Sequence, residues 1–174
     1  CTSVVSVEDK IDPLAAGQAL PGARAVTFTV THDIPNNQGF RGLLLDPVDE
    51  TLAYAFVLGR NGGAPLLYSD HNESGDNRWV DAWRRADLTA MVGFHNANRA
   101  EDMQVLAAGA RHLLFRRGQR GIVGINKCGE PIELSVNIAG SGLRPLRSYR
   151  ELLAGGSITL DGGTQSIVLP ARSA

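Results

Sequence analysis

The chain has 174 residues, of which 43% are hydrophobic and 20% are charged, a composition typical of a folded globular protein and not of a disordered or fibrous one. Its Lys and Arg residues number 17 against 18 Asp and Glu residues, which gives a formal net charge of -1. No run of like charges and no long apolar stretch occurs, so nucleic acid and membranes are not expected as partners. This balance suits a neutral polar substrate.

The chain begins with Cys1 and not with Met. No charged and apolar leader opens it, so we expect either that a leader was removed or that an N-terminal part is absent. Cys1 and Cys128 have neither a CxxC spacing nor a disulfide-rich context, and we interpret both as unpaired thiols without a function.

Residues 1–22 contain several Pro and Gly residues and no sustained period, which predicts a loop. The β-branched run over residues 25–31 then predicts a buried strand, and it ends in His32 and Asp33. In barrel enzymes, catalytic residues follow the carboxyl ends of strands. Asp33 is therefore a candidate catalytic carboxylate, although hydrolases of this chemistry need further acids and none is evident nearby. Residues 34–42 predict a long polar loop.

A helix is predicted from Asp46, which can cap it, through Pro47 to Gly59. Residues 64–70 predict a second short buried strand that also ends in polar residues, Asp70 and His71. These elements give the order strand, helix, strand.

A second helix follows, because Leu88, Met91, Val92 and His95 have helical spacing, with Asp87 as a possible cap. The first part of the chain thus reads as two strand–helix units.

The pattern changes near Met103 to short runs separated by glycine-containing turns. We predict an antiparallel Greek-key β-sandwich over residues 103–174, and an α/β region over residues 1–102. The predicted strands cover residues 111–116, 121–126, 132–138, 157–160 and 165–169.

Two strand–helix units cannot close a (β/α)8 TIM barrel, which takes about 250 residues, so the first part is expected to belong to a larger domain. Here the chain resembles the alpha-amylases. Residues 28–33 are similar to their barrel motif Phe-x-x-Asn-His-Asp, and residues 51–58 and 63–69 are similar to the next helix and strand. Residues 114–127 are similar to the Phe-x-Arg-Gly-x-x-Gly-x-x-x-x-Asn hairpin that opens their C-terminal β-domain.

The resemblance implies that the chain is the C-terminal part of an alpha-amylase: the last two strand–helix units of the TIM barrel, then the β-sandwich. Asp33 would match the family's carboxylate that stabilises the transition state, and His32 the histidine that binds the same sugar. The parent would cleave internal α-1,4-glucosidic bonds of starch or maltooligosaccharides with retention.

The resemblance further implies that the parent's nucleophilic Asp and acid/base Glu precede this chain, which alone would be inactive and poorly soluble. The parent is expected to be secreted and monomeric, and to bind calcium in the absent part. No cofactor or metal is expected in this segment.

Some positions depart from the family pattern. Thr31 stands where Asn is usual, and residues 64–69 lack the Arg of chloride-dependent members, so no chloride site is predicted. Residues 39–41 echo the family's nucleophile motif, but Leu43 follows where an Asp is required, so we interpret the match as chance.

Alternatives remain open for individual residues. His32 and Asp33 could form a strand-end cap, and Asp70 with His71 could either line a cleft or solvate a loop. The same four residues could make a His2Asp2 metal site.

His95 and His112 are interpreted as structural. Trp79 and Trp83 suit sugar stacking, but packing of a short helix is favoured. A second class of function for the whole chain is a non-catalytic glucan-binding or structural fragment.

Overall fold

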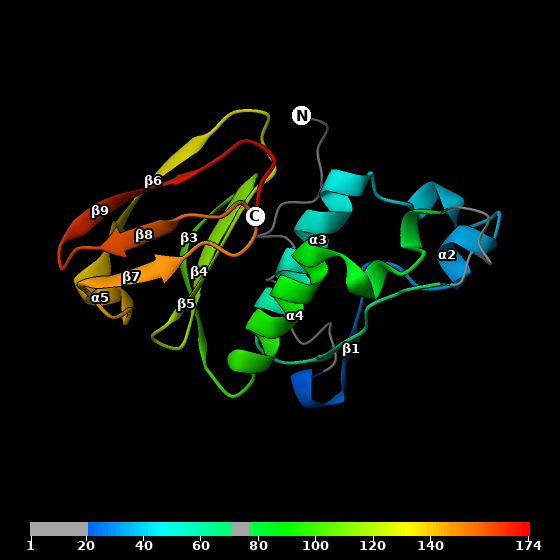
Figure 1. Cartoon of the computed structure of the whole chain (residues 1–174), viewed down its shortest axis with the longest axis horizontal. Coiled ribbons are helices and arrows are strands. Elements are labelled where there is room, and N and C mark those ends of the chain that lie inside the picture. The colour runs from blue at the N-terminus through cyan, green and yellow to red at the C-terminus, as the bar shows by residue number, and fades with distance from the viewer. Residues whose placement is uncertain (1–20, 71–76) are drawn as a thin grey trace.

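The computed structural model describes residues 21–70 and 77–174, so Cys1, His71 and nearly all of the predicted N-terminal loop lie outside the described residues. Figure 1 shows two regions: helices and two very short strands on one side, and antiparallel strands on the other. None of the helices in the described part is long and apolar enough to cross a membrane.

The first region contains one parallel strand pair. β1 (Val26–Thr27) pairs with β2 (Ala64–Pro65), with Val26 opposite Ala64. Both strands are much shorter than predicted, and the prediction of a buried strand is wrong for Val26, which is 63% exposed, and Phe28, which is 48% exposed. The physical reason is that, among residues 21–70 and 77–174, each strand pairs only with the other, whereas parallel sheets are stable when both faces are covered.

Two long helices accompany these strands. α3 (Pro47–Gly59) begins as predicted, because the Asp46 carboxylate accepts hydrogen bonds from the backbone N–H groups of Val48 and Asp49 at 2.9 and 3.0 Å. The hydrogen bond from Asp49 holds the pKa of Asp46 below its ordinary value.

α4 (Ala86–Ala97) has Arg85 at its N-cap, so the predicted cap, Asp87, is wrong. The Asp87 carboxylate lies in the first helical turn, where it accepts hydrogen bonds from the Arg85 guanidinium at 2.5 and 3.1 Å.

Several short helical turns lie between these elements. The loop predicted over residues 34–42 contains α2 (Asp33–Asn36) and leads into η2 (Arg41–Leu43). Other single turns are η1 (Gly22–Arg24), η3 (Asn77–Trp79) and η4 (Ala82–Arg84).

The second region is antiparallel throughout. β3 (Met103–Gly109), β4 (His112–Arg117) and β5 (Gly121–Asn126) form a meander, with an irregularity between Val105 and Ala107. The sequence did not predict β3, whereas β4 and β5 are confirmed to within one residue.

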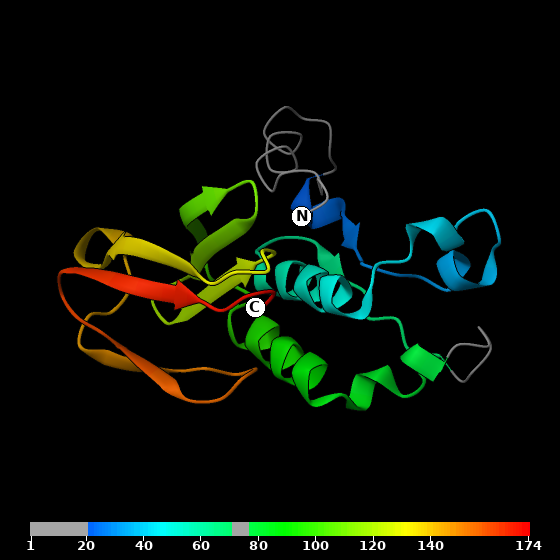
Figure 2. The same cartoon turned by 90° about the horizontal axis from the view of Figure 1, so that it is seen from above.

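β6 (Ile132–Asn137) pairs with β9 (Thr164–Leu169), and the segment between them contains α5 (Ile138–Ser141) and the hairpin of β7 (Arg147–Arg150) with β8 (Ser157–Leu160). In Figure 2 the hairpin of β7 and β8 lies below the pair of β6 and β9. The predicted β6, β8 and β9 are confirmed, and β7 is an addition. A Greek-key arrangement stays a prediction.

Two hydrophobic clusters hold the described residues together. One lies within the antiparallel region, and the other joins α3 and α4 to β4 and β5 through Leu113, Phe115 and Ile125. β3 begins at Met103, where the sequence places the domain boundary. Because the cluster that joins α3 and α4 to β4 and β5 includes residues on both sides of Met103, the two regions share a core. The division into residues 1–102 and 103–174 stays a prediction.

Candidate functional site

The predicted site residues His32 and Asp33 lie at the start of α2, five residues beyond the end of β1. His32 Nε2 is 3.3 Å from Asp33 Oδ1, and the two side chains are 77% and 64% exposed. His32 is the N-cap residue of α2, but its side chain makes no capping hydrogen bond. The two side chains instead pair with each other and are both largely exposed to solvent.

The loop that carries Asp33 is held by its own backbone. The Arg41 guanidinium donates a hydrogen bond to the carbonyl of Pro35 at 2.6 Å, and the Asn37 side chain accepts one from the N–H of Gly39 at 2.9 Å. These bonds hold residues 39–41 in a local turn; that their likeness to a nucleophile motif is chance stays a prediction.

The loops after β1 and β2 leave the same edge of the pair, because the strands are parallel. Figures 1 and 2 both place α2 and the η3 segment on the side of the molecule away from the antiparallel strands. This is the edge where parallel-sheet enzymes build their sites.

Asp70 does not solvate a loop, since it is only 6% exposed. Its carboxylate accepts a hydrogen bond from the Tyr68 hydroxyl at 3.1 Å, and its N–H donates to the carbonyl of Trp79 at 3.1 Å. Asp70 therefore fixes the segment that returns to the end of β2.

The His2Asp2 alternative includes His71, which lies outside the described residues. Within residues 21–70 and 77–174, no three His, Cys, Asp or Glu side chains gather in a way that could hold a metal ion.

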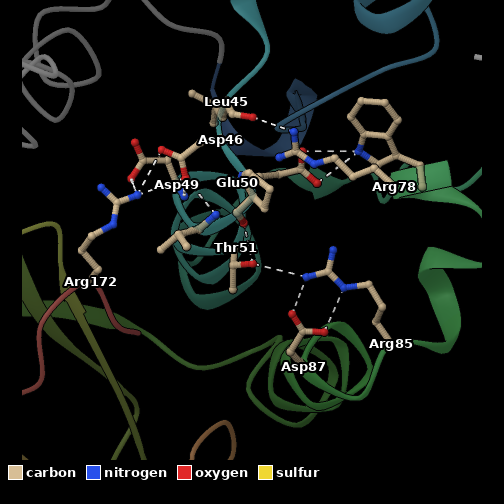
Figure 3. Close-up of polar contacts among 12 residues, drawn as sticks. Leu45, Asp46, Asp49, Glu50, Thr51, Arg78, Arg85, Asp87 and Arg172 are labelled. Carbon is tan, nitrogen blue, oxygen red and sulfur yellow. Dashed lines mark hydrogen bonds and ion pairs between the residues drawn. The ribbon is translucent and has the colours of Figure 1, made fainter. Parts of the chain in front are cut away.

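A charged cluster surrounds Glu50 in the first turn of α3 (Figure 3). Glu50 of α3 is 3% exposed and pairs with Arg78 at 2.7 Å, while the indole N–H of Trp79 donates to its carboxylate at 3.1 Å. Arg78 also donates to the carbonyl of Leu45 at 2.7 Å. The cluster links the segments before α3 and after β2 to the helix.

The two tryptophans have different surroundings. Trp79 is fully buried, which confirms packing, whereas the same interpretation is wrong for Trp83, which is 54% exposed. Trp79, in η3, belongs to the buried cluster that also contains residues of α3 and α4, whereas Trp83, in the separate turn η4, does not.

The hairpin motif that underlies the family resemblance forms a joint between the two regions. Arg117 is fully buried, and its Nη1 donates to the carbonyls of Gly59 and Arg60, both at 2.6 Å. Its Nη2 donates to the carbonyls of Asn98 at 2.5 Å and Glu101 at 3.3 Å. A cation thus meets the C-terminal ends of both α3 and α4, where the helix dipole favours positive charge. Burial lowers the pKa of Arg117.

Other motif residues serve the same joint. Phe115 is fully buried in the shared cluster, and Gly118 has a φ of +52° that favours glycine. A Cβ on Gly121 would lie 2.9 Å from the Phe94 ring and 3.1 Å from the Cβ of Arg117, so α4 approaches the hairpin closely only because of this glycine. The resemblance did not assign a role to these residues.

Asn126 is the last residue of the hairpin motif. It is fully buried, and its amide donates to the carbonyls of Glu130, Leu169 and Pro170, while its oxygen accepts from the N–H of Cys128. Cys128 is a buried free thiol.

The predicted structural role of His95 is confirmed, because its Nδ1 lies 3.1 Å from the carbonyl of Leu58 and links α4 to α3. The His112 ring packs directly over Gly109, where a Cβ would come within 2.6 Å of it.

No family model matches the chain. Over 171 residues the chain is 46% identical to an alpha-amylase of Aeromonas hydrophila, a match that covers 96% of the chain and 37% of that relative. This similarity along nearly the whole chain is consistent with a C-terminal fragment of an alpha-amylase family protein. The chain spans well under half the length of this alpha-amylase.

Solved alpha-amylases share the fold of the described residues. Alpha-amylase I of the earthworm Eisenia fetida superimposes with a TM-score of 0.69 at 20% identity, over 90% of this chain and 41% of that one. A variant of that enzyme in complex with maltohexaose gives 0.73 at 21% identity, over the same shares of the two chains. An alpha-amylase of Malbranchea cinnamomea gives 0.69 at 18% identity, over 97% and 40%. At these identities the likeness concerns the fold alone.

Proposed function

We propose that this chain is the C-terminal part of a retaining alpha-amylase that hydrolyses internal α-1,4-glucosidic bonds in starch. The observation that carries the proposal is the 46% identity to an alpha-amylase along 96% of the chain. β1, α3, β2 and α4 would be the last two strand–helix units of a TIM barrel, and the antiparallel region would be the β-sandwich. Because the identity extends over the segment with the site residues, the alternative of a purely non-catalytic fragment is less well supported.

Asp33 is proposed to stabilise the transition state, and His32 to bind the same sugar. Glycoside cleavage develops positive charge at the anomeric carbon, and a nearby carboxylate and hydrogen bonds to the sugar hydroxyls favour that state. The high exposure of both side chains and their position at the carboxyl edge of the strand pair support this role. The nucleophile and the acid/base would come from the remainder of the parent protein.

The remainder would also supply the calcium site. We further propose a secreted, monomeric parent whose partner is an α-glucan; the maltohexaose complex of the earthworm variant supports this ligand class by analogy.

The test is Asp33→Asn in the full-length protein. We expect kcat/KM on soluble starch to fall by at least about a hundredfold, because a charge that acts chiefly in the transition state is lost. Asp102→Asn is the matched control: Asp102 is an exposed acid at the start of the antiparallel region, and its removal should leave the rate nearly unchanged. Full activity of the Asp33 variant would refute the assigned role.

The isolated chain should show no hydrolysis of starch. Turnover by this chain alone would contradict the proposal that two of the three catalytic acids lie elsewhere.

A further inference from the structure

We propose that Trp83 is a stacking platform for one glucose ring of a linear α-glucan, at the same edge of the molecule as Asp33. The proposed function supplies the substrate class; the platform itself rests on the exposure, orientation and support of the indole.

The exposure of Trp83 is unusual for so large an apolar side chain. Trp83 is 54% exposed, whereas Trp79, four residues earlier, is fully buried and hydrogen-bonded to Glu50. Burial of an indole stabilises a fold by some kcal/mol, so an exposed indole contributes little to stability. Flat aromatic faces suit the apolar faces of sugar rings, which gives the exposed indole a ligand of matching chemistry.

Neighbouring groups orient the indole. The guanidinium carbon of Arg84 lies 4.6 Å from the centre of the Trp83 ring, and Arg84 pairs with Asp81 at 3.4 Å. Asp81 has a φ of 52°, and the turn it makes starts η4. One ring face is thus covered by a cation, and the exposed area lies on the remainder. Asp81 and Arg84, both largely exposed, are suitable hydrogen-bond partners for sugar hydroxyls.

The platform stands on a fixed base. Upstream, Val80 bridges to Asp70, and the carbonyl of Trp79 accepts hydrogen bonds from the N–H of Asp70 and the hydroxyl of Ser69. Downstream, the Thr89 hydroxyl donates to the carbonyl of Trp83 at 3.3 Å, within the first turns of α4. Rigid support lowers the conformational entropy that is lost when a ligand binds.

The position relative to Asp33 follows from topology. The segment with Trp83 is held through the bridge of Val80 to Asp70, five residues beyond the end of β2, and α2 follows β1, which is parallel to β2. A linear oligosaccharide that reaches Asp33 therefore approaches the edge of the molecule that carries Trp83.

The chain contains two tryptophans, so two indole N–H signals are expected in a ¹H–¹⁵N spectrum of the full chain, and Trp83→Phe assigns them. On titration with maltohexaose we expect the Trp83 signal to shift and the Trp79 signal to stay. Trp83→Ala should weaken maltohexaose affinity, followed by calorimetry, by about tenfold, and Trp83→Phe by less, because an aromatic face remains. Leu146→Ala, which removes an even more exposed apolar side chain in the antiparallel region, is the control and should bind as wild type.

A Trp83 signal that does not move with maltohexaose, or a Trp83→Ala variant with unchanged affinity, would overturn the platform. Equal shifts with cellohexaose would overturn its α-glucan specificity. These outcomes are independent of the Asp33→Asn rate, so failure of the platform and failure of the proposed catalytic role are distinguishable.

Discussion

The parallel pair β1–β2 and the antiparallel pair β4–β5 have very different extents. The parallel pair has two residues in each strand, and Val26 in β1 and Phe28 just beyond it are exposed. The antiparallel pair has six in each, with Leu113, Leu114 and Phe115 at most 1% exposed. The two pairs differ in extent because they differ in the strands and helices that lie beside them.

Antiparallel strands joined by a tight turn find their partner within the same few residues, whereas parallel strands depend on partners that are distant in the chain. The antiparallel region also completes a cluster of its own and contributes Phe115 to a second one. The stability of the helical region is thus expected to come largely from its contact with β4 and β5.

The largest expected effect comes from breaking that contact. Arg117→Met removes the donor to four main-chain carbonyls at the ends of α3 and α4, and we expect a loss of about 3–5 kcal/mol in the free energy of unfolding, measured in urea. Arg116→Met is the matched control. Its guanidinium binds Asp102, which is 65% exposed, so its loss should be about 1 kcal/mol or less. Equal losses for the two variants would contradict the central role of Arg117.

The next effect lies inside the helical region. Glu50→Gln removes the charge that pairs with the largely buried Arg78, and we expect a loss of about 2–3 kcal/mol by the same measurement. Asp49→Asn, on the adjacent residue, loses only a partly exposed contact with Arg172 and should cost about 0.5 kcal/mol. If the Trp79 indole signal stays unchanged in Glu50→Gln, the cluster does not position that ring.

A smaller effect concerns acid sensitivity at the boundary between the regions. The hydrogen bond from Arg116 lowers the pKa of Asp102 below its ordinary value of 3.8. A carboxylate with a lowered folded-state pKa stabilises the fold above the unfolded-state value, and this contribution is lost as the pH falls through the folded-state value. Asp102→Asn should therefore show a smaller fall in Tm between pH 7 and pH 3 than the wild type. An identical fall would show that the pair is not coupled to folding.

The smallest effect on stability is expected at the exposed strands. Replacement of Val26 by Ser should change the free energy of unfolding by no more than about 0.5 kcal/mol, because this side chain is already 63% exposed. Solubility should rise, since an exposed apolar patch promotes association. A large loss of stability would show that this face is covered in solution.

Sequence reasoning was most successful where the determining interactions are local. Asp46 and Pro47 define the start of α3 through a cap and a first helical position, and the turn glycines define β5. It failed where interactions beyond the local pattern determine the structure. The length of β1 depends on neighbouring strands, and Asp87 does not cap α4 because Arg85 binds its carboxylate.

For the candidate site, the sequence identified His32 and Asp33, whose catalytic roles stay predictions. It did not identify the partners of Glu50, since Arg78 and Trp79 lie about thirty residues away. The exposure of Trp83 also has no local signature, because neighbouring short helical turns bury one indole and leave the other in solvent.

The contacts of Arg117 have one more consequence. All of its hydrogen bonds go to main-chain carbonyls. The contact therefore depends on the positions of the helix ends and not on the side chains near them. Residues 60, 98 and 101 can therefore change during evolution without loss of this contact. An insertion of one residue near the end of either helix would displace its carbonyls, so the joint tolerates substitution far better than changes in helix length.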